Sequence, residues 1–199
     1  MANTSTPLVV GIGGTTGGMS STERALRIAM AAAERHGLAT ATFGGDVLAR
    51  LPHYNPKRDA LTADEARLVA AVRGASALIV ASPGYHGSIS GLVKNALDLV
   101  EETVRDARVY LDHLPVGLIA TAYGWQATGS TIAALRSIVH ALRAWPTPLA
   151  AGINCKLARF DDEGGCTDPD AVRQLEMVGD QVAHFLARPP AIVLPVARS

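Results

Sequence analysis

Three short polar segments of this sequence carry residue types that bind a phosphate group and a flat polar ring. Residues 15–22 are threonine, serine and glycine with one methionine, and residues 83–88 combine a proline, a tyrosine, a histidine, a serine and two glycines. Residues 123–130 form a third segment, with hydroxyl and amide side chains and two aromatic residues. Hydroxyls and backbone N–H groups bind phosphate oxygens, and aromatic faces pack against rings. Together the segments favour a ligand that has both parts.

The first segment is predicted to connect a strand to a helix. Residues 8–14 form a short apolar run that ends in glycine, and apolar residues then recur at helical spacing between Ala25 and Ala33. In such a connection the loop amides and the helix N-terminus together cradle a phosphate. The segment is neither a Walker loop nor a dinucleotide-binding glycine motif. A tight turn with a Ser/Thr helix cap is the alternative interpretation of this segment taken alone.

The second segment has features that suit a flat polar ring. The apolar run at residues 77–81 predicts a buried strand before it, and helical spacing resumes after it. Pro83 stiffens the entry to the loop, and Gly84 and Gly87 let the backbone approach a ligand closely. Tyr85 offers a flat face with a polar tip. A strand, this loop and a helix would place a ligand at the carboxyl end of a parallel sheet.

Five strand patterns alternate with five helix patterns along the chain. This alternation predicts an α/β fold, with a doubly wound five-stranded parallel sheet in the order 2-1-3-4-5 and helices on both faces. The loops after the first, third and fourth strands then meet at the switch point of the sheet, and these loops are the three polar segments. Their convergence supports phosphate and ring binding more strongly than any one loop does. The strands are predicted at residues 8–14, 39–43, 77–81, 116–122 and 148–154.

Length and composition favour one globular domain. The chain has 199 residues, of which 48% are apolar and 18% charged, so it is long enough for a single core and is not disordered. We expect one domain over residues 1–199, with a flexible N-terminus at residues 1–7 and a C-terminal tail at residues 187–199. The apolar end of this tail is expected to pack on the body of the protein or on a partner.

Charge and motif content exclude several other classes of protein. The 18 basic and 18 acidic residues cancel, so neither a nucleic-acid partner nor a membrane partner is expected. The chain start lacks a signal-peptide pattern and no apolar run is long enough to cross a bilayer, which predicts a cytoplasmic protein. Cys155 and Cys166 are therefore expected to be reduced thiols. The histidines lack metal-ligand spacing and no nucleophile elbow is present, so we predict neither a metal site nor a catalytic side chain.

Three further features concern the parts around the loops. Residues 48–56 are predicted to form a surface connection, with a lip over the ligand or a subunit contact as the alternatives. Thr62 and Glu65 have the spacing of a capping box at the start of a helix. Lys94 and Asp98 lie four residues apart, the spacing of an ordinary surface ion pair. We therefore assign Lys94 a structural or solvated role and not a catalytic one.

The stretch from Pro83 to Asp98 resembles the signature loop and helix of the NADPH-dependent FMN reductase family. That pattern has Pro-x-Tyr, a small polar residue, glycine, and then Leu/Val-Lys-Asn-Ala-Leu-Asp. The resemblance covers roughly residues 8–155 and implies a flavodoxin-like fold. The matching residues are Pro83, Tyr85, Ser88, Gly91, Lys94, Asn95, Ala96, Leu97 and Asp98.

The resemblance implies that FMN and NAD(P)H are the cofactors. The implied activity is a ping-pong hydride transfer from the nicotinamide to FMN and on to a small-molecule acceptor, such as free flavin or a quinone. The phosphate would lie in the first loop, and the ring would rest on the second loop and face the third. A surface position is the alternative for His86. The implied cofactor-binding residues are Thr15, Thr16, Gly17, Gly18, Ser20, Ser21, Pro83, Gly84, Tyr85, His86, Gly87, Ser88, Tyr123 and Gly124.

The first loop departs from the family pattern Gly-Ser-x-Arg-x-x-Ser. Gly14, Thr15 and Ser20 fit it, but Gly17 stands where the arginine is expected. The departure removes a cation that would offset the phosphate charge, and it predicts looser binding of the phosphate. Arg24, or a basic residue from elsewhere in the chain, would have to replace that cation.

Three functions remain open at this point. The first is an NAD(P)H-dependent FMN reductase, the second a flavodoxin-type electron carrier without nicotinamide turnover, and the third a structural or regulatory protein that keeps the fold without flavin. The neutral net charge and the Lys-Asn-Ala-Leu-Asp segment favour the reductase. The resemblance also implies a homodimer or homotetramer, and a flavin-dependent monooxygenase is one partner that such an enzyme would suit. The sequence leaves open the choice of NADH or NADPH, the acceptor, and whether FMN is a prosthetic group or a substrate.

Overall fold

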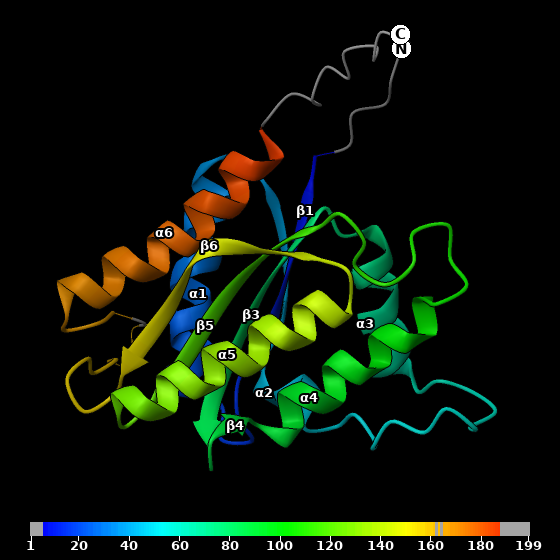
Figure 1. Ribbon diagram of the computed structural model, residues 1–199, viewed down its shortest axis with the longest axis horizontal. Helices are drawn as coiled ribbons and strands as arrows, with labels where there is room; N and C mark the ends of the chain where they lie inside the picture. Colours follow the sequence, from blue (N-terminus) through cyan, green and yellow to red (C-terminus); the bar gives the residue numbers. More distant parts are fainter. Residues whose placement is uncertain (1–5, 162, 164, 188–199) are drawn as a thin grey trace, which may run out of the picture.

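Five parallel strands form the central sheet of the computed structural model, which describes residues 6–161, 163 and 165–187 (Figure 1). Their order is β2-β1-β3-β5-β6, and a short sixth strand, β4, pairs antiparallel with β3. The parallel strands therefore have the predicted order 2-1-3-4-5. Most of the predicted N-terminal segment and almost all of the predicted tail lie outside the described residues. The strands are β1 (Leu8–Gly13), β2 (Ala39–Phe43), β3 (Ala77–Tyr85), β4 (Ser88–Ile89), β5 (Pro115–Ala122) and β6 (Trp145–Asn154).

Helices cover both faces of the sheet, as predicted (Figure 1). Helices α1 and α6 pack side by side on one face, and α3, α4 and α5 cover the other. No helix among the described residues is long and apolar enough to cross a membrane. The helices are α1 (Ser21–Arg35), α2 (Gly45–Leu48), α3 (Ala63–Gly74), α4 (Gly91–Asp98), α5 (Trp125–Ala141) and α6 (Pro169–Leu186), with a 3₁₀ helix, η1 (Leu99–Thr103), after α4.

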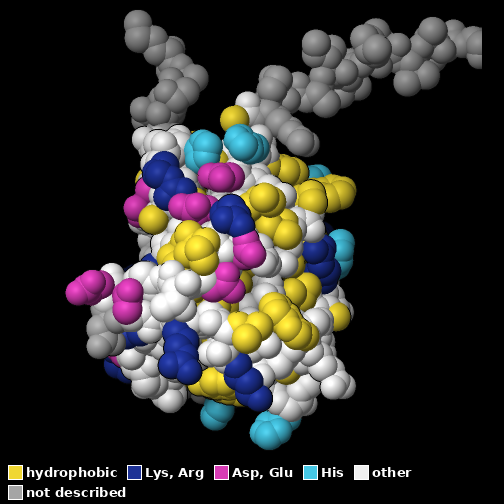
Figure 2. Space-filling view, turned by 90° about the vertical axis from the view of Figure 1, so that its left-hand side faces the viewer, with side chains coloured by type: hydrophobic (Ala, Val, Ile, Leu, Met, Phe, Trp, Pro, Cys, Tyr) yellow, Lys and Arg dark blue, Asp and Glu magenta, His cyan; other side chains and the backbone are white. Residues whose placement is uncertain are grey.

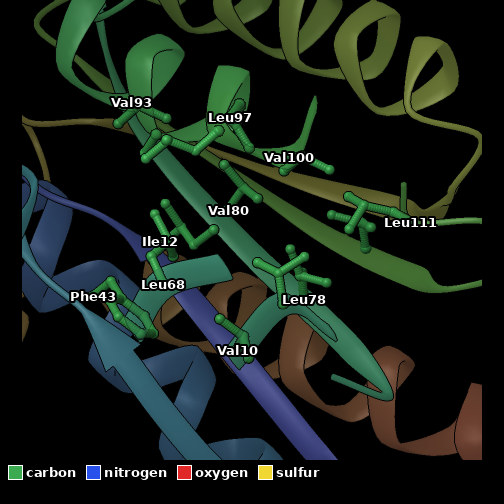
Figure 3. Close-up of a cluster of buried hydrophobic side chains, with 14 of the residues drawn as sticks. Val10, Ile12, Phe43, Leu68, Leu78, Val80, Val93, Leu97, Val100 and Leu111 are labelled. Carbon is green, nitrogen blue, oxygen red and sulfur yellow. The ribbon is translucent and has the colours of Figure 1, made fainter. Parts of the chain in front are cut away.

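The central strands are buried on both faces, because successive side chains of a strand point to opposite sides. Val10 and Leu78 lie in the cluster under α3, α4 and α5, which Figure 3 shows from close by. Their neighbours Val9 and Ile79 lie in the second cluster, under α1 and α6. This burial on both faces explains why the strands read as continuous apolar runs and not as an alternating pattern.

The predicted loop after β3 is wrong in its first half. The strand continues to Tyr85, and a two-residue turn at His86 and Gly87 returns the chain as β4, with Tyr85 paired to Ser88. Both turn residues have a positive φ, 49° for His86 and 89° for Gly87, as a type I′ hairpin turn requires. The buried Ser82 fixes the base of this hairpin, because its Oγ accepts a hydrogen bond from Ser90 N at 3.0 Å.

The predicted third loop is also shorter than expected. Helix α5 begins at Trp125, so only Tyr123 and Gly124 separate it from β5. The polar residues that suggested a loop lie on this helix, and Thr128 and Thr131 are buried. Their hydroxyls donate to backbone carbonyls of the same helix, at 2.8 Å from Thr128 and 2.7 Å from Thr131. A buried threonine that satisfies its hydroxyl in this way is compatible with a helix.

The edge strand β6 and helix α6 form one side of the molecule. Figure 2 shows that hydrophobic side chains lie in small groups between charged ones on this side. Trp145 and Met177 are among the exposed hydrophobic residues of these two elements. Pro146 and Pro148 lie on β6 and have no N–H group to donate to another strand. This edge is therefore poorly suited to pair with a further strand.

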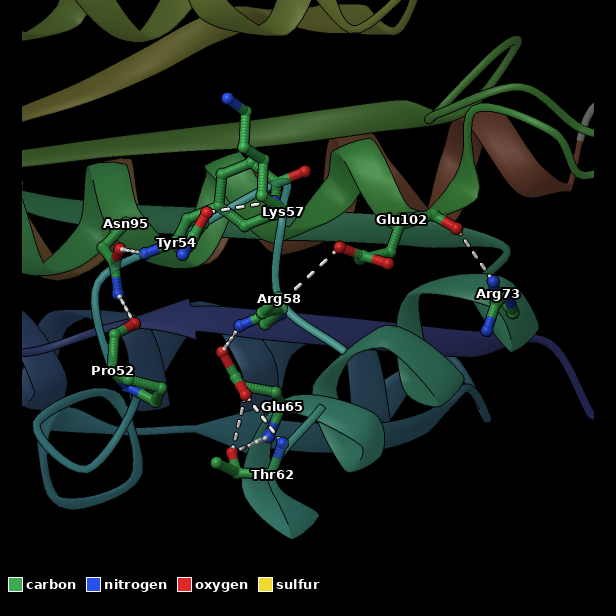
Figure 4. A network of polar contacts seen from close by, with 10 residues as sticks. Pro52, Tyr54, Lys57, Arg58, Thr62, Glu65, Arg73, Asn95 and Glu102 are labelled. Atoms are coloured by element: carbon green, nitrogen blue, oxygen red, sulfur yellow. Dashed lines mark hydrogen bonds and ion pairs between the residues drawn. The ribbon is translucent and has the colours of Figure 1, made fainter. Parts of the chain in front are cut away.

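The connection between α2 and α3 is pinned to the body of the protein (Figure 4). Asn95 on α4 holds it at two points: its Nδ2 donates to Pro52 O at 2.9 Å, and its Oδ1 accepts from Tyr54 N at 2.8 Å. The predicted capping box is confirmed, because Thr62 and Glu65 exchange hydrogen bonds at the start of α3. The predicted pair of Lys94 and Asp98 is also present, at 2.5 Å.

Replacing Asn95 by alanine is expected to lower the free energy of unfolding by about 1–2 kcal/mol, because two hydrogen bonds to the connection are lost. The connection should then be cut faster in limited proteolysis. Urea unfolding and a proteolysis time course measure the two effects. The control is Lys94→Ala on the same helix, whose exposed ion pair contributes about 0.5 kcal/mol or less. Equal results for both variants would contradict the role given to Asn95.

Candidate functional site

The carboxyl ends of the parallel strands meet at one edge of the sheet (Figure 1). Gly13 at the end of β1 lies beside Ala81 of β3, and Pro83 of β3 lies beside Thr121 of β5. The chain leaves β1 toward one side of the sheet and β3 toward the other. The segments after β1, β3 and β5 are therefore neighbours at the switch point, where open α/β sheets bind ligands.

Two adjoining cavities lie at this edge. The larger has a volume of about 330 Å³ and the smaller about 140 Å³, and Thr15 and Tyr85 line both. The larger cavity is lined by Thr15, Ser20, Ser21, Thr22, Pro83, Gly84, Tyr85, Thr121, Ala122, Tyr123 and Cys155. The smaller is lined by Gly14, Thr15, Thr16, Tyr85, Ser90, Gly91 and Leu92.

The structure brings many of the predicted binding residues together around these cavities. Those that line a cavity are Thr15, Thr16, Ser20, Ser21, Pro83, Gly84, Tyr85 and Tyr123. Those that do not are Gly17, Gly18, His86, Gly87, Ser88 and Gly124. His86 and Gly87 form the exposed hairpin tip, and Gly17 and Gly18 form the exposed top of the first loop. The binding role of both sets stays a prediction.

The first loop ends in a capped helix N-terminus, as the strand–loop–helix prediction requires. Ser20 is the N-cap of α1, and its Oγ accepts a hydrogen bond from Glu23 N at 3.3 Å. The Oγ1 of Thr15 donates to Gly17 O at 3.3 Å. A capping serine still has a hydroxyl proton to donate, and the other first-turn N–H groups of a helix have no partner within that helix. The loop therefore offers neutral hydrogen-bond donors to an oxygen-rich ligand.

The floor of the larger cavity contains three residues that sequence reasoning missed. Thr22 and Thr121 join α1 to the end of β5 through a buried hydrogen bond between their hydroxyls, 2.5 Å long. Cys155 follows β6, and its backbone N donates to Ala122 O at 2.8 Å. Burial raises the pKa of the Cys155 thiol, so it stays protonated near neutral pH. The position of Thr121 and Cys155 could have identified them. They lie near the end of β5 and directly after β6, and these parallel strands end at the same edge of the sheet.

The segment that follows β2 packs against the backbone of the first loop. A Cβ atom placed on Gly45 would lie 1.8 Å from Thr15 O, so this glycine lets the two backbones touch. The carboxylate of Glu23 is nearly buried there, and its Oε2 accepts from Gly45 N at 3.2 Å. These contacts join segments that are distant in the sequence, and no local pattern predicts them.

Exposed aromatic rings border the larger cavity. Tyr85 is 52% exposed and Tyr123 is 71% exposed, and both line that cavity. Trp125, at the first position of α5, is 59% exposed and lines neither cavity. No charged side chain is among the described residues that line the two cavities. The site can therefore bind a flat ring and hydrogen-bond a polar chain.

Solved structures share this fold. The structure is similar to that of an NADH:FMN oxidoreductase, EMOB, in its apo form, with a TM-score of 0.71, 21% identity and coverage of 93% of this chain and 92% of that one. It is also similar to FerB, a flavoenzyme NAD(P)H:(acceptor) oxidoreductase from Paracoccus denitrificans, with a TM-score of 0.71, 20% identity and coverage of 90% and 97%. At these identities the likeness shows the flavodoxin-like fold.

Curated relatives match part of the chain. An FMN-dependent NADPH-azoreductase from Staphylococcus haemolyticus is 32% identical over 122 residues, which are 60% of this chain and 61% of the relative. The enzyme of the same description from Staphylococcus aureus (strain USA300) is 31% identical over 115 residues, 57% of each chain. The match thus spans about three fifths of the length of these relatives. The model of the NADPH-dependent FMN reductase family matches residues 7–156, and the chain belongs to that family.

Proposed function

We propose that the chain is an NAD(P)H-dependent FMN reductase. The observation that carries this proposal is that the loop after β1, the end of β3, and the end of β5 with Tyr123 line one cavity, which combines hydroxyl groups with Pro83 and two tyrosines. Family membership and the azoreductase relatives support it. We further propose that residues 1–199 form one FMN-binding domain.

The residues at this edge fit the parts of FMN. Thr15, Ser20 and Ser21 would hold its polar chain through hydroxyl and N–H donors. Pro83 and Tyr85 would support the ring, which supplies, when bound, a centre that accepts hydride from NAD(P)H and passes electrons to an acceptor in a ping-pong sequence. The protein's part is to position the ring and to exclude water from one of its faces. This work needs no side chain that acts as an acid or a base.

The exposed rings of Tyr85 and Tyr123 support a flat, aromatic acceptor, because they border the larger cavity without closing it. Azo compounds, quinones and free flavins belong to this class, and the curated relatives are azoreductases. A homodimer or homotetramer, a monooxygenase partner and a cytoplasmic location remain parts of the proposal that rest on the family resemblance and the sequence.

The first experiment titrates flavin-stripped protein with FMN and then adds NADPH or NADH without oxygen, while the visible flavin absorbance is recorded. Rapid bleaching of the bound flavin is the expected result, and the faster donor identifies the preferred nicotinamide. Binding without bleaching would favour the electron-carrier alternative. Absence of binding would favour a protein that keeps the fold without flavin.

A further inference from the structure

We propose that this site recognises its flavin through the ring and the sugar-alcohol chain and gains little from the terminal phosphate. Riboflavin, which lacks that phosphate, should then bind within about tenfold of FMN and be reduced in the same reaction. The inference rests on the proposed function, because it names the class of flavin that the same site accepts. It is carried by the first loop and by the charges that surround it.

The top of the first loop is open at the position where the family pattern has its arginine. Gly17 is exposed, and a Cβ atom placed on it would meet no other atom within 4 Å. Its φ is not positive, so a larger residue would fit there without backbone strain. The loop therefore has the space for a phosphate-binding side chain but not the side chain itself.

Two carboxylates lie against this loop. A Cβ atom placed on Gly18 would lie 3.4 Å from Oδ1 of Asp46, so this carboxylate lies directly against the loop. Glu23 lies under Gly14 and is nearly buried, and the exposed Arg27, at 3.1 Å, offsets its charge. A phosphate dianion held by the loop would be repelled by Asp46, whereas a neutral hydroxyl chain would not.

The guanidinium groups around the loop are engaged with protein acceptors. Nη1 of Arg24 donates to Phe160 O at 3.0 Å, and Arg24 lines neither cavity. Arg50 binds Asp64 and the backbone O of Asp46, both at 2.8 Å. Among the described residues that line the two cavities, only neutral hydroxyls and N–H groups donate. Such donors also bind the hydroxyls of the sugar-alcohol chain, and no cation among these lining residues adds to their attraction for a phosphate.

The test measures dissociation constants for FMN and for riboflavin by quenching of flavin fluorescence. In the unmodified chain the two constants should lie within about tenfold of each other. In Gly17→Arg, FMN should bind about tenfold more tightly and riboflavin should be unchanged, because the added charge contacts only the phosphate. Gly17→Gln is the control, since it adds a polar side chain that can donate hydrogen bonds but carries no charge. Asp46→Asn should tighten FMN alone, by about threefold.

A larger preference for FMN in the unmodified chain would overturn the inference. So would an equal gain for both flavins in Gly17→Arg, or a gain of the same size in Gly17→Gln. The two proposals fail in different ways. If both flavins bind within tenfold of each other but NAD(P)H reduces neither, the proposed reductase is wrong and the inference about flavin recognition stands. If FMN alone binds and is reduced, the inference is wrong and the reductase stands. If neither flavin binds, both are wrong.

Discussion

Replacing Gly84 by valine is expected to weaken the binding of FMN and of riboflavin alike, by about 100-fold. Gly84 lines the larger cavity and lies where β3 passes the first turns of α5. A Cβ atom on it would lie 2.6 Å from Oγ1 of Thr131 and 3.1 Å from Ala127 O. Thr131 cannot swing away freely, because it is buried and bonded to the same carbonyl. The strand would therefore have to move toward the cavity, and a shift of about 1 Å in a binding surface can reduce its function by about 100-fold.

Gly74 provides the control for this substitution. It is the last residue of α3, it lines neither cavity, and a Cβ atom on it would meet no other atom within 4 Å. Gly74→Val should therefore change flavin affinity by less than about threefold. Fluorescence titration measures both affinities, and circular dichroism checks that both variants are folded.

A second variant tests the cause of the Gly84 effect. Removing the hydroxyl of Thr131 in a Gly84→Val, Thr131→Ala double variant takes away the nearest obstructing atom. The double variant should recover part of the lost affinity, because non-additive effects are expected for residues in contact. Equal affinity in the single and double variants would show that the obstruction at Thr131 is not the reason.

The sheet order and the position of the site could be predicted because they depend on patterns that repeat along the chain. The apolar run at residues 77–81 is buried on both faces, and such runs are typical of a parallel sheet that is covered on both sides. Once the alternation of strands and helices is fixed, topology places the segments after β1, β3 and β5 together. The topology therefore also predicts that the hydroxyl groups of residues 15–22 lie at this site.

Local polarity predicted the loops less accurately than the apolar runs predicted the sheet. The hairpin turn at His86 and Gly87 was read as a flexible loop because its residues are polar and small. The same reasoning predicts a loop at Thr128, although this residue satisfies its hydroxyl within α5. Propensity describes what a residue type usually does, and a buried partner overrides it.

Contacts between distant segments could not be predicted from the sequence at all. Gly45 touches Thr15 across thirty positions of the chain, and only the folded structure shows that it shapes the first loop. Asn95 belongs to the segment that identified the family, and its role as a clamp on Pro52 and Tyr54 was equally hidden. The role of such a residue depends on the distant segment that it contacts, and the sequence alone does not show which segments are in contact.

The second large effect is expected at Arg58, where substitution by methionine should lower the free energy of unfolding by about 2–3 kcal/mol. Its partner Glu65 has no exposed surface, and Arg58 is the cation that donates to it (Figure 4). Breaking a buried pair by removing one partner typically costs about 3–5 kcal/mol. The effect should be smaller here, because the side chain of Arg58 is 15% exposed and Thr62 also donates to Glu65, at 2.8 Å.

Urea unfolding at pH 7 measures this loss. Arg173→Met is the control, since the pair of Arg173 with Asp170 is exposed and on the same scale contributes about 0.5 kcal/mol or less. In a Glu65→Gln background, Arg58→Met should cost less, because no buried charge is left without a partner. A loss at Arg58 that is the same in both backgrounds would mean that packing over the ring of Tyr54, 5.4 Å away, is its real contribution.

The pH dependence of the loss in stability further distinguishes the ion pair of Arg58 with Glu65 from the packing of Arg58 over Tyr54. Burial alone would raise the pKa of Glu65, but hydrogen bonds from the Thr62 backbone and hydroxyl, and then from Arg58, outweigh it and hold that pKa below its usual value. A carboxyl group with a lowered pKa stabilises the fold above its unfolded pKa, about 4.3, and this stability is lost as the pH falls through the folded pKa. The cost of Arg58→Met should therefore be greatest at neutral pH and shrink as the solution is acidified below pH 4, where a neutral Glu65 no longer needs the cation. A cost that stays constant over this range would assign the contribution of Arg58 to packing and not to charge.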